Sequence, residues 1–212
     1  MNHLVPREAE NLVLSSLEPN KVLVLLGPRR VGKTILLKRI RKRLDKNALM
    51  FNGEDFSVQE VLARRSVHHY QDMLDGANCL IIDEAQFVPE IGSILKLMVD
   101  GIPGLQIVIS GSSAFDISSY LGDPLTGRKK TLYLFGLSDK ELYQTEKVTE
   151  HKSGLNKRLV FGSYPELLQK EDNTQKVEYL KELIHSYLFK DILAFENLKN
   201  AEKIYNLLRL IA

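Results

Sequence analysis

Short apolar runs alternate along the chain with longer stretches in which apolar and polar residues mix. The apolar runs contain no alternating polar positions, which is typical of strands buried on both faces in a parallel sheet covered by helices. We therefore predict five strands, at residues 22–26, 48–51, 79–82, 107–109 and 132–135. The run at 48–51 is the weakest of the five.

The stretches between the runs predict helices. Residues 33–44 carry apolar residues at helical spacing directly after the first strand. Residues 89–100 form a second such stretch, and Gly101 would end it. Two serine–glutamate pairs have the spacing of a capping box, in which each side chain bonds the other residue's backbone N–H. They are Ser57 with Glu60, which would open a helix through Arg65, and Ser138 with Glu141.

This alternation predicts a three-layer α/β sandwich around a central parallel sheet of about five strands. After about residue 137 no further strand run occurs, and apolar residues recur at helical spacing, at Val177, Leu180, Ile184 and Leu188 and then over 204–211. We expect one domain over residues 1–145 and a mainly helical region over residues 146–212.

The last residues, 209–212, lie inside an apolar periodic segment without a glycine, proline or polar terminator. We expect that more protein follows and that 146–212 is the start of a larger C-terminal domain. The alternative is a last helix that packs on the core and ends with the chain.

Composition narrows the picture only slightly. The 212 residues carry a net charge of +2, which does not by itself indicate a nucleic-acid or membrane partner. No run approaches the roughly 20 apolar residues that cross a bilayer. The single cysteine, Cys79, excludes a disulfide within the chain, fits a reducing compartment such as the cytoplasm, and is expected to be inert in its buried strand.

The basic residues of 33–44 are expected to form a solvated helix face and not a nucleic-acid site. The apolar face of the same helix would be made by Ile35, Leu36, Leu37, Ile40 and Leu44.

The strongest chemical motif lies between the first strand and the first long helix. Gly27, four variable residues, Gly32, Lys33 and Thr34 form the P-loop pattern, in the strand-to-helix context that it requires. Glycines let backbone N–H groups approach phosphates, and the helix directs its positive end at them. We expect a nucleoside triphosphate to bind here, most simply ATP with Mg²⁺.

We expect the nucleotide to contact the whole loop and the start of the helix. The candidate binding residues are Gly27, Pro28, Arg29, Arg30, Val31, Gly32, Lys33, Thr34 and Ile35. Lys33 would reach the β- and γ-phosphates, and the Thr34 hydroxyl would bind Mg²⁺. Arg29 and Arg30 occupy variable positions whose side chains usually point away from phosphate, so we assign them no side-chain chemistry.

An apolar strand that ends in Asp83 and Glu84 supplies the second motif. Asp83 would hold Mg²⁺, and Glu84 would polarise a water for attack on the γ-phosphate. The chain between this motif and the P-loop leaves room for an additional strand. That arrangement is typical of the P-loop division with a catalytic glutamate, to which AAA-type ATPases and helicases belong.

Two weaker candidates follow. The strand at 107–109 is followed by Ser110 and Ser112. A hydroxyl at the carboxyl end of a strand can sense the γ-phosphate, so Ser110 or Ser112 is the candidate. Ser113, by contrast, has the spacing of a helix cap with Asp116. Arg128 is a candidate phosphate-sensing arginine, in its own subunit or in a neighbouring one. A solvated loop charge is the alternative for Arg128.

With these residues in view, the chain resembles prokaryotic AAA-type ATPases that join an N-terminal P-loop domain to a C-terminal domain of unknown function, and it looks related to the archaeal ATPase and STAND-like branches. The resemblance runs from about residue 4 to the end. It is carried by the stretches 26–34, 82–86 (Ile-Asp-Glu-Ala-Gln), 109–113, 125–128, 137–142, 162–166 (Gly-Ser-Tyr-Pro-Glu) and 190–192.

The resemblance implies ATP binding, ATP hydrolysis and a winged-helix segment beyond the helical region. The sequence departs from the family pattern at Gly136, where the family usually has proline before Leu-Ser, and at Ser163, which replaces a glycine. Neither departure touches the phosphate motifs. Any DNA-binding function would depend on the winged helix, which we expect to begin about where this chain stops.

Four functions therefore stay open. The leading one is a Mg²⁺-dependent ATPase that couples nucleotide state to a conformational change, with ATP and ADP as ligands and a homo-oligomer or protein partner. A slow-turnover nucleotide switch uses the same motifs. A small-molecule phosphotransferase is disfavoured, because Glu84 would waste ATP on water. A DNA-associated regulator would need the winged-helix segment that we expect beyond residue 212.

Overall fold

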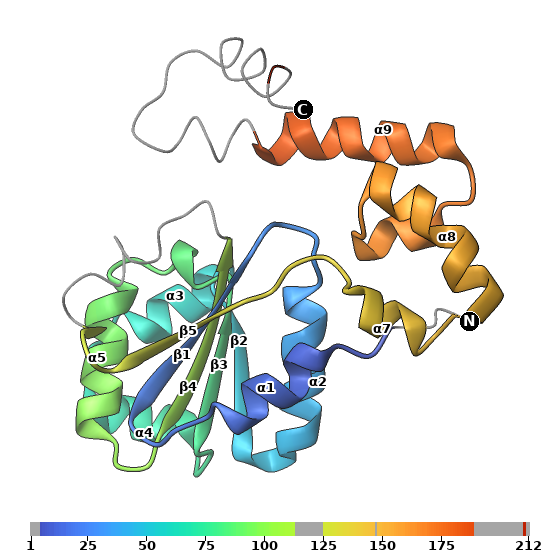
Figure 1. Cartoon of the computed structure of the whole chain (residues 1–212). Coiled ribbons are helices and arrows are strands. Elements are labelled where there is room, and N and C mark those ends of the chain that lie inside the picture. The colour runs from blue at the N-terminus through green and yellow to red at the C-terminus, as the bar shows by residue number, and fades with distance from the viewer. Residues whose placement is uncertain (1–4, 113–124, 147, 189–209, 211–212) are drawn as a thin grey trace.

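A computed structural model of the chain describes residues 5–112, 125–146, 148–188 and 210, and the account below concerns these residues. Its centre is a five-stranded, fully parallel sheet in the order β2-β3-β4-β1-β5 (Figure 1). The strands are β1 (Lys21–Gly27), β2 (Ala48–Asn52), β3 (Cys79–Asp83), β4 (Gln106–Ser112) and β5 (Lys129–Tyr133). β4 lies between β1 and β3, so the additional strand that the sequence predicts is confirmed.

Helices cover both faces of the sheet. α1 (Glu8–Ser15) and α2 (Lys33–Leu44) pack on one face. α3 (Phe56–Leu62), α4 (Val67–Leu74) and α5 (Ile91–Gly101) pack on the other, as Figure 1 shows. The three-layer α/β sandwich predicted from the sequence is confirmed.

The strands are continuously apolar because alternate residues enter two different cores. Val22 and Val24 of β1 pack with α3, α4 and α5, whereas Leu23 and Leu25 pack with α1 and α2. All four side chains are at most 3% exposed. The two faces of a central strand are therefore both buried, and its polar residues are few and lie at its ends, as Asp83 does in β3. Cys79 of β3 is fully buried, as predicted, and burial raises the pKa of its thiol to about 11.

Three local expectations need correction. β5 begins at Lys129, three residues before the predicted run, because this edge strand pairs only with β1 within the described sheet and its side chains are half-buried or exposed. α3 is capped by Asp55, whose carboxylate accepts from the Ser57 N–H at 2.9 Å, and not by a Ser57–Glu60 box. Ile35 is 45% exposed, so it is not part of the buried face of α2.

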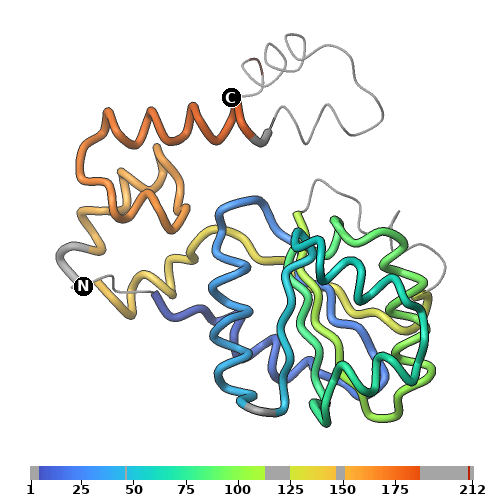
Figure 2. Tube along the Cα trace, turned by 180° about the vertical axis from the view of Figure 1, so that it is seen from behind, coloured from blue at the N-terminus to red at the C-terminus, as the bar shows by residue number. Residues whose placement is uncertain are grey.

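The helical region lies beyond the α2 side of the sandwich, away from α5, in both Figure 1 and Figure 2. It comprises α7 (Asp139–Tyr143), α8 (Val148–Phe161), the 3₁₀ helix η4 (Pro165–Gln169), α9 (Asn173–Leu183) and the π-helical turn η5 (Ile184–Leu188). The capping box of Ser138 and Glu141 is confirmed at the start of α7. In α9 the buried residue is Tyr179, and Val177, which we expected on the apolar face, is 40% exposed. The predicted segment 204–211 lies outside the described residues, except for residue 210.

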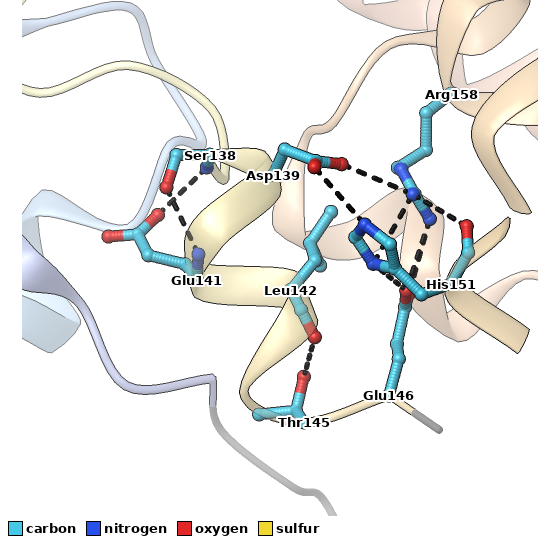
Figure 3. Close-up of polar contacts among 8 residues, drawn as sticks. All are labelled: Ser138, Asp139, Glu141, Leu142, Thr145, Glu146, His151 and Arg158. Carbon is cyan, nitrogen blue, oxygen red and sulfur yellow. Dashed lines mark hydrogen bonds and ion pairs between the residues drawn. The ribbon is translucent and has the colours of Figure 1, made fainter. Parts of the chain in front are cut away.

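Charged side chains join α7 to α8 (Figure 3). Arg158 donates to the carboxylates of Glu146 and Asp139 at 3.1 and 3.3 Å, and to the His151 carbonyl at 2.9 Å. A backbone hydrogen bond of 2.7 Å from the Leu137 N–H to the Ser163 carbonyl ties the same region to the sandwich.

The division of the chain at residue 145 stays a prediction, and contacts such as this one cross it. No helix among the described residues is long and apolar enough to span a membrane.

Candidate nucleotide-binding site

The three predicted phosphate motifs meet at one edge of the sheet. The P-loop leaves the carboxyl end of β1, Asp83 ends β3, and the serines end β4 between them. Gly27 is opposite Ser112 in the ladder between β1 and β4. The carboxyl ends of parallel strands are where α/β proteins bind ligands.

The two glycines of the P-loop are required by geometry. A Cβ at Gly27 would collide with the carbonyl of Leu134 after β5, so only glycine fits. Gly32 has φ 97° and stands directly before the first residue of α2, a backbone conformation that favours glycine. Arg30 also has a positive φ, of 63°, which bends the loop between the two glycines.

Lys33 is folded back over the loop that it follows. Its ammonium group donates to the carbonyl of Gly27 at 2.8 Å and to the carbonyl of Pro28 at 3.0 Å, and the residue is only 4% exposed. These bonds hold the cation inside the P-loop, where a phosphate would meet it.

Asp83 and Thr34 offer oxygen ligands for a metal ion, one from the end of β3 and one from the start of α2. Asp83 is 4% exposed at the end of β3, and the Ser110 hydroxyl donates to its Oδ1. Thr34 lies in the first turn of α2 and is partly exposed. A buried carboxylate and a hydroxyl are hard oxygen ligands of the kind that Mg²⁺ takes together with substrate phosphates and water, so the residues present fit this ion.

Ser110 is fully buried and fully engaged. Besides donating to Asp83, its hydroxyl accepts from the backbone N–H of Glu84 at 3.0 Å. Ser112, two residues later, is 1% exposed, and its hydroxyl has no hydrogen-bond partner within the described part of the chain. Of the two serines between which the sequence could not decide, Ser110 orders the Asp83–Glu84 turn, and Ser112 is the one whose hydroxyl is uncommitted beside the P-loop.

Glu84 is held in an unusual backbone conformation, with φ 51° and ψ 46°. The side-chain amide of Gln86 donates to its carboxylate. Gly53 at the end of β2 lies so close that a Cβ there would stand 2.5 Å from the Glu84 carbonyl. Sequence reasoning missed both neighbours, although Gln86 stood in the quoted Asp-Glu-Ala-Gln stretch and could have been found there.

Arg128 lies at the opposite end of the sheet. Its carbonyl accepts from the N–H of Val22, near the start of β1, and its side chain pairs with Asp100 at 2.7 Å near the end of α5. The five residue steps from Val22 to Gly27 span about 16 Å of strand. The prediction that Arg128 acts at the nucleotide of its own subunit is therefore wrong. Arg128 lies at the amino end of β5, whereas the phosphate motifs lie at the carboxyl ends of the strands.

An apolar hollow adjoins the P-loop on the side of the helical region. Arg7 and Arg39 contribute the charged part of its wall. Its apolar walls come from the N-terminal segment, the P-loop, α2, the β5–α7 connection and η4: Val5, Val31, Ile35, Leu137, Pro165 and Leu168. Apolar walls beside a phosphate cradle are suited to a nucleotide base. Exposure of Ile35 here explains why it leaves the buried face of α2.

Arg30 reaches from the P-loop to the helical region. Its guanidinium pairs with Glu166 of η4 at 3.0 Å and with Glu182 of α9 at 3.5 Å. It also lies 5.9 Å from the centre of the Tyr179 ring. Burial, with Glu166 next in effect, raises the pKa of Tyr179 to about 12. The side chain of Arg30 therefore points to the helical region, as the variable P-loop positions predict.

Similar solved structures include a katanin chain, with a TM-score of 0.48, 14% identity and coverage of 66% of this chain and 55% of that one. They also include the Pif1 helicase from Candida albicans, with a TM-score of 0.44, 16% identity and coverage of 66% and 42%. Both scores lie below 0.5, so the family assignment depends on the sequence matches.

Sequence relatives are uncharacterized prokaryotic proteins. One from Methanocaldococcus jannaschii is 28% identical over 204 residues, covering 88% of this chain and 45% of the relative. One from Haemophilus influenzae is 28% identical over 185 residues, covering 81% and 44%. The chain therefore spans under half the length of these relatives.

Two family models match successive parts of the chain. Residues 152–212 match a domain of unknown function (DUF8612), so the pairing that the motifs suggested, a P-loop domain followed by an uncharacterised one, is confirmed. Residues 19–143 match the AAA domain, more than half of the chain, and cover all three phosphate motifs. AAA domains are nucleotide-binding P-loop domains. The chain belongs to the AAA domain family.

Proposed function

We propose that this protein is a Mg²⁺-dependent ATPase in which Glu84 activates the attacking water. The observation that carries the proposal is the Asp83–Glu84 turn, which Ser110, Gln86 and Gly53 hold in one conformation at the phosphate edge of the sheet. A carboxylate fixed beside a P-loop is suited to orient water, whereas a phosphotransferase would exclude it.

Phosphate binding would use the backbone N–H groups after Gly27 and the positive end of α2. Lys33 would exchange its bonds to the Gly27 and Pro28 carbonyls for bonds to phosphate oxygens. Thr34 and Asp83 would hold Mg²⁺, directly or through water, and the bound ion would neutralise charge on the β- and γ-phosphates.

Water activation requires that Glu84 keep its position while the triphosphate changes charge. The Gln86 amide donates to the carboxylate and limits its rotation, and Ser110 holds the backbone. Ser112 would donate its hydroxyl to the γ-phosphate or to the water, since that hydroxyl is buried and uncommitted beside Gly27. Leaving such a group without a partner is costly, which favours a ligand for it.

The base would lie in the apolar hollow next to Gly32. Its wall includes Ile35 from α2 and Leu168 from η4, so the base would touch both the sandwich and the helical region. ATP is preferred over GTP on the family resemblance and on the absence from the sequence of the Asn-Lys-x-Asp motif that reads guanine.

Coupling to the helical region would pass through Arg30. This residue belongs to the phosphate loop, yet its ion pairs are with Glu166 and Glu182 outside it. Phosphate in the loop would compete electrostatically with these carboxylates for the guanidinium, so nucleotide state and the position of η4 and α9 would be linked.

Phosphate release by the wild-type protein and by Glu84→Gln tests the proposal. We expect a rate at least 100-fold lower in Glu84→Gln, with ATP binding retained, because general-base catalysis contributes about that factor or more. Glu54→Gln removes an exposed carboxylate from the neighbouring β2 turn and should change nothing.

Equal rates in the wild type and Glu84→Gln would remove Glu84 as the base. Negligible turnover by the wild type, with nucleotide firmly bound, would favour a switch that acts through its bound state. No nucleotide binding by the wild type would overturn the proposal altogether.

A further inference from the structure

Arg7 belongs to the N-terminal segment, yet it hydrogen-bonds the P-loop. It precedes α1 and lies 24 residues before Val31, yet its side chain is only 9% exposed. Nη1 donates to the carbonyl of Val31, inside the P-loop, at 2.8 Å. Nη2 donates to the carbonyl of Phe135 at 2.7 Å, and Nε to the carboxylate of Glu141 at 3.1 Å.

Glu141 holds this guanidinium in place. One oxygen of its carboxylate accepts from Arg7 and, at 2.8 Å, from the backbone N–H of Glu8. The other accepts from the N–H of Ser138 at 2.9 Å, which Figure 3 shows as part of the capping box. Arg7 and Glu141 are both nearly buried, so neither can turn to solvent without leaving a buried charge unpaired.

The bond to Val31 has a consequence for the next residue. The carbonyl of Val31 and the N–H of Gly32 belong to one planar peptide unit, and no peptide bond in the described chain is cis. In a trans peptide these two groups point in opposite directions. Fixing the carbonyl toward Arg7 therefore fixes the Gly32 N–H on the other side. Gly32 directly precedes α2, and at φ 97° it would otherwise be among the freest residues of the loop.

We propose that Arg7 is a positioning residue for the nucleotide site: by holding the Val31 carbonyl, it directs the Gly32 N–H at the phosphates. This inference rests on the proposed nucleotide function. Arg7 does not touch the phosphate itself; it acts through one peptide plane. Glu141 of α7 is the anchor of the arrangement, so the β5–α7 connection supports the P-loop from outside the motif.

Arg7→Lys tests the role, because lysine keeps the charge beside Glu141 but its donors share one nitrogen, without the planar fork by which Nε, Nη1 and Nη2 of arginine reach three separate acceptors. We expect ATP and ADP to bind about tenfold more weakly. AMP lacks the β-phosphate that the loop N–H groups meet, so its affinity should change less than twofold. Nucleotide affinities are measured by competition against a fluorescent ADP analogue, and melting temperature alongside.

Arg158→Lys is the matched control. Arg158 is also nearly buried, at 10% exposure, and also binds two carboxylates and a carbonyl (Figure 3). Its partners, Asp139, Glu146 and His151, all lie outside the P-loop. We expect a comparable loss of melting temperature with ATP affinity within twofold of the wild type. If Arg7→Lys does not fold, Arg7→Met combined with Glu141→Gln removes the Val31 bond without leaving an unpaired charge, and should show the same selective loss.

The outcomes separate cleanly. Unchanged ATP and ADP affinity in a folded Arg7 variant overturns the positioning role, as does an equal loss for ATP and AMP, which indicates damage to the base pocket. A fall in melting temperature alone assigns Arg7 a structural role only. If the wild type itself binds no nucleotide, the proposed function fails instead.

Discussion

The sandwich and the helical region are stabilised in different ways. In the sandwich, two apolar clusters fill both faces of the sheet, and β3 is buried along its whole length. In the described part of the helical region after residue 145, only Leu167 and Tyr179 are buried apolar residues, while ion pairs are numerous. The pairs of Arg158 lie within the helical region and are nearly buried, whereas those that join Arg30 of the P-loop to this region are more exposed. Exposed ion pairs contribute little and are screened by salt, so the helical region is the part whose position relative to the P-loop can change at low cost.

The same difference distinguishes the rigid phosphate-site residues from the exposed ion pairs that join the P-loop to the helical region. Asp83, Ser110 and Lys33 sit at the end of a close-packed sheet, where side chains have little freedom. Arg30, by contrast, is about a third exposed and meets carboxylates that are more exposed still. A nucleotide switch needs both, a fixed site and a contact that can be exchanged.

Truncating one leucine in each region tests most directly whether the two regions differ in how they are stabilised. Leu37 of α2 is fully buried, and Leu159 of α8 is 76% exposed. We expect Leu37→Ala to lower the free energy of unfolding by about 2–5 kcal/mol and Leu159→Ala to change it by less than about 0.5 kcal/mol. Denaturant titration measures both. Similar losses would show that the Leu159 side chain is buried in solution, which contradicts the contrast between the two regions.

Glu141 gives an intermediate effect at the border of the two regions. Burial acts to raise its pKa, but the N–H groups of Ser138 and Glu8 and the charge of Arg7 outweigh it, so the folded-state pKa lies below the ordinary value of 4.5. A lowered pKa stabilises the fold above the unfolded-state value, and that stabilisation is lost as pH falls through the folded-state value.

We therefore expect Glu141→Gln to be less stable than the wild type by about 1–3 kcal/mol at pH 7, and the gap to narrow steadily below about pH 4.5. Thermal melts across pH 3–7 measure it, with the exposed Glu171→Gln as control. A gap that is constant with pH would show that the lost carboxylate charge is not the cause.

The ion pair of Arg30 with Glu166 should be weaker. Its side chains are 36% and 39% exposed, so a double-mutant cycle with Arg30→Gln and Glu166→Gln should give a coupling of about 0.2–1 kcal/mol that shrinks in 0.5 M salt. The exposed Lys21–Glu18 pair is the reference. If saturating ATP abolishes the Arg30 coupling and leaves the reference pair unchanged, the proposed link to nucleotide state is strengthened; an ATP-independent coupling contradicts it.

The smallest effect is expected at Arg128. Its pair with Asp100 is 40% and 42% exposed at the far edge of the sheet, so Arg128→Ala should cost less than about 0.5 kcal/mol and leave phosphate release unchanged at low protein concentration. A loss of activity that grows with protein concentration would instead support a finger that acts on a neighbouring subunit.

The sheet could be predicted because its central strands are buried on both faces, which leaves uninterrupted apolar runs such as 79–82. β5 was misplaced by three residues because an edge strand has no such constraint. The P-loop and Asp83–Glu84 motifs are local in sequence, so spacing was enough to find them. Arg7 and Gly53 were missed because their importance depends on contacts made across the fold; Arg7 and Val31 are 24 residues apart. Gln86 lies only two residues from Glu84, so it could have been found from the sequence.

The backbone bond between Leu137 and Ser163 bears on how the protein is divided for experiments. The AAA match begins at residue 19 and ends at residue 143, yet α1 lies before it and Tyr164 lies after it, and both pack on the second core of the sandwich. Cutting the gene at the limits of the family match would strip that core of its cover on two sides. The limits of the family match are therefore not the limits of the folding unit, and a stable fragment should begin before Arg7 and extend past η4.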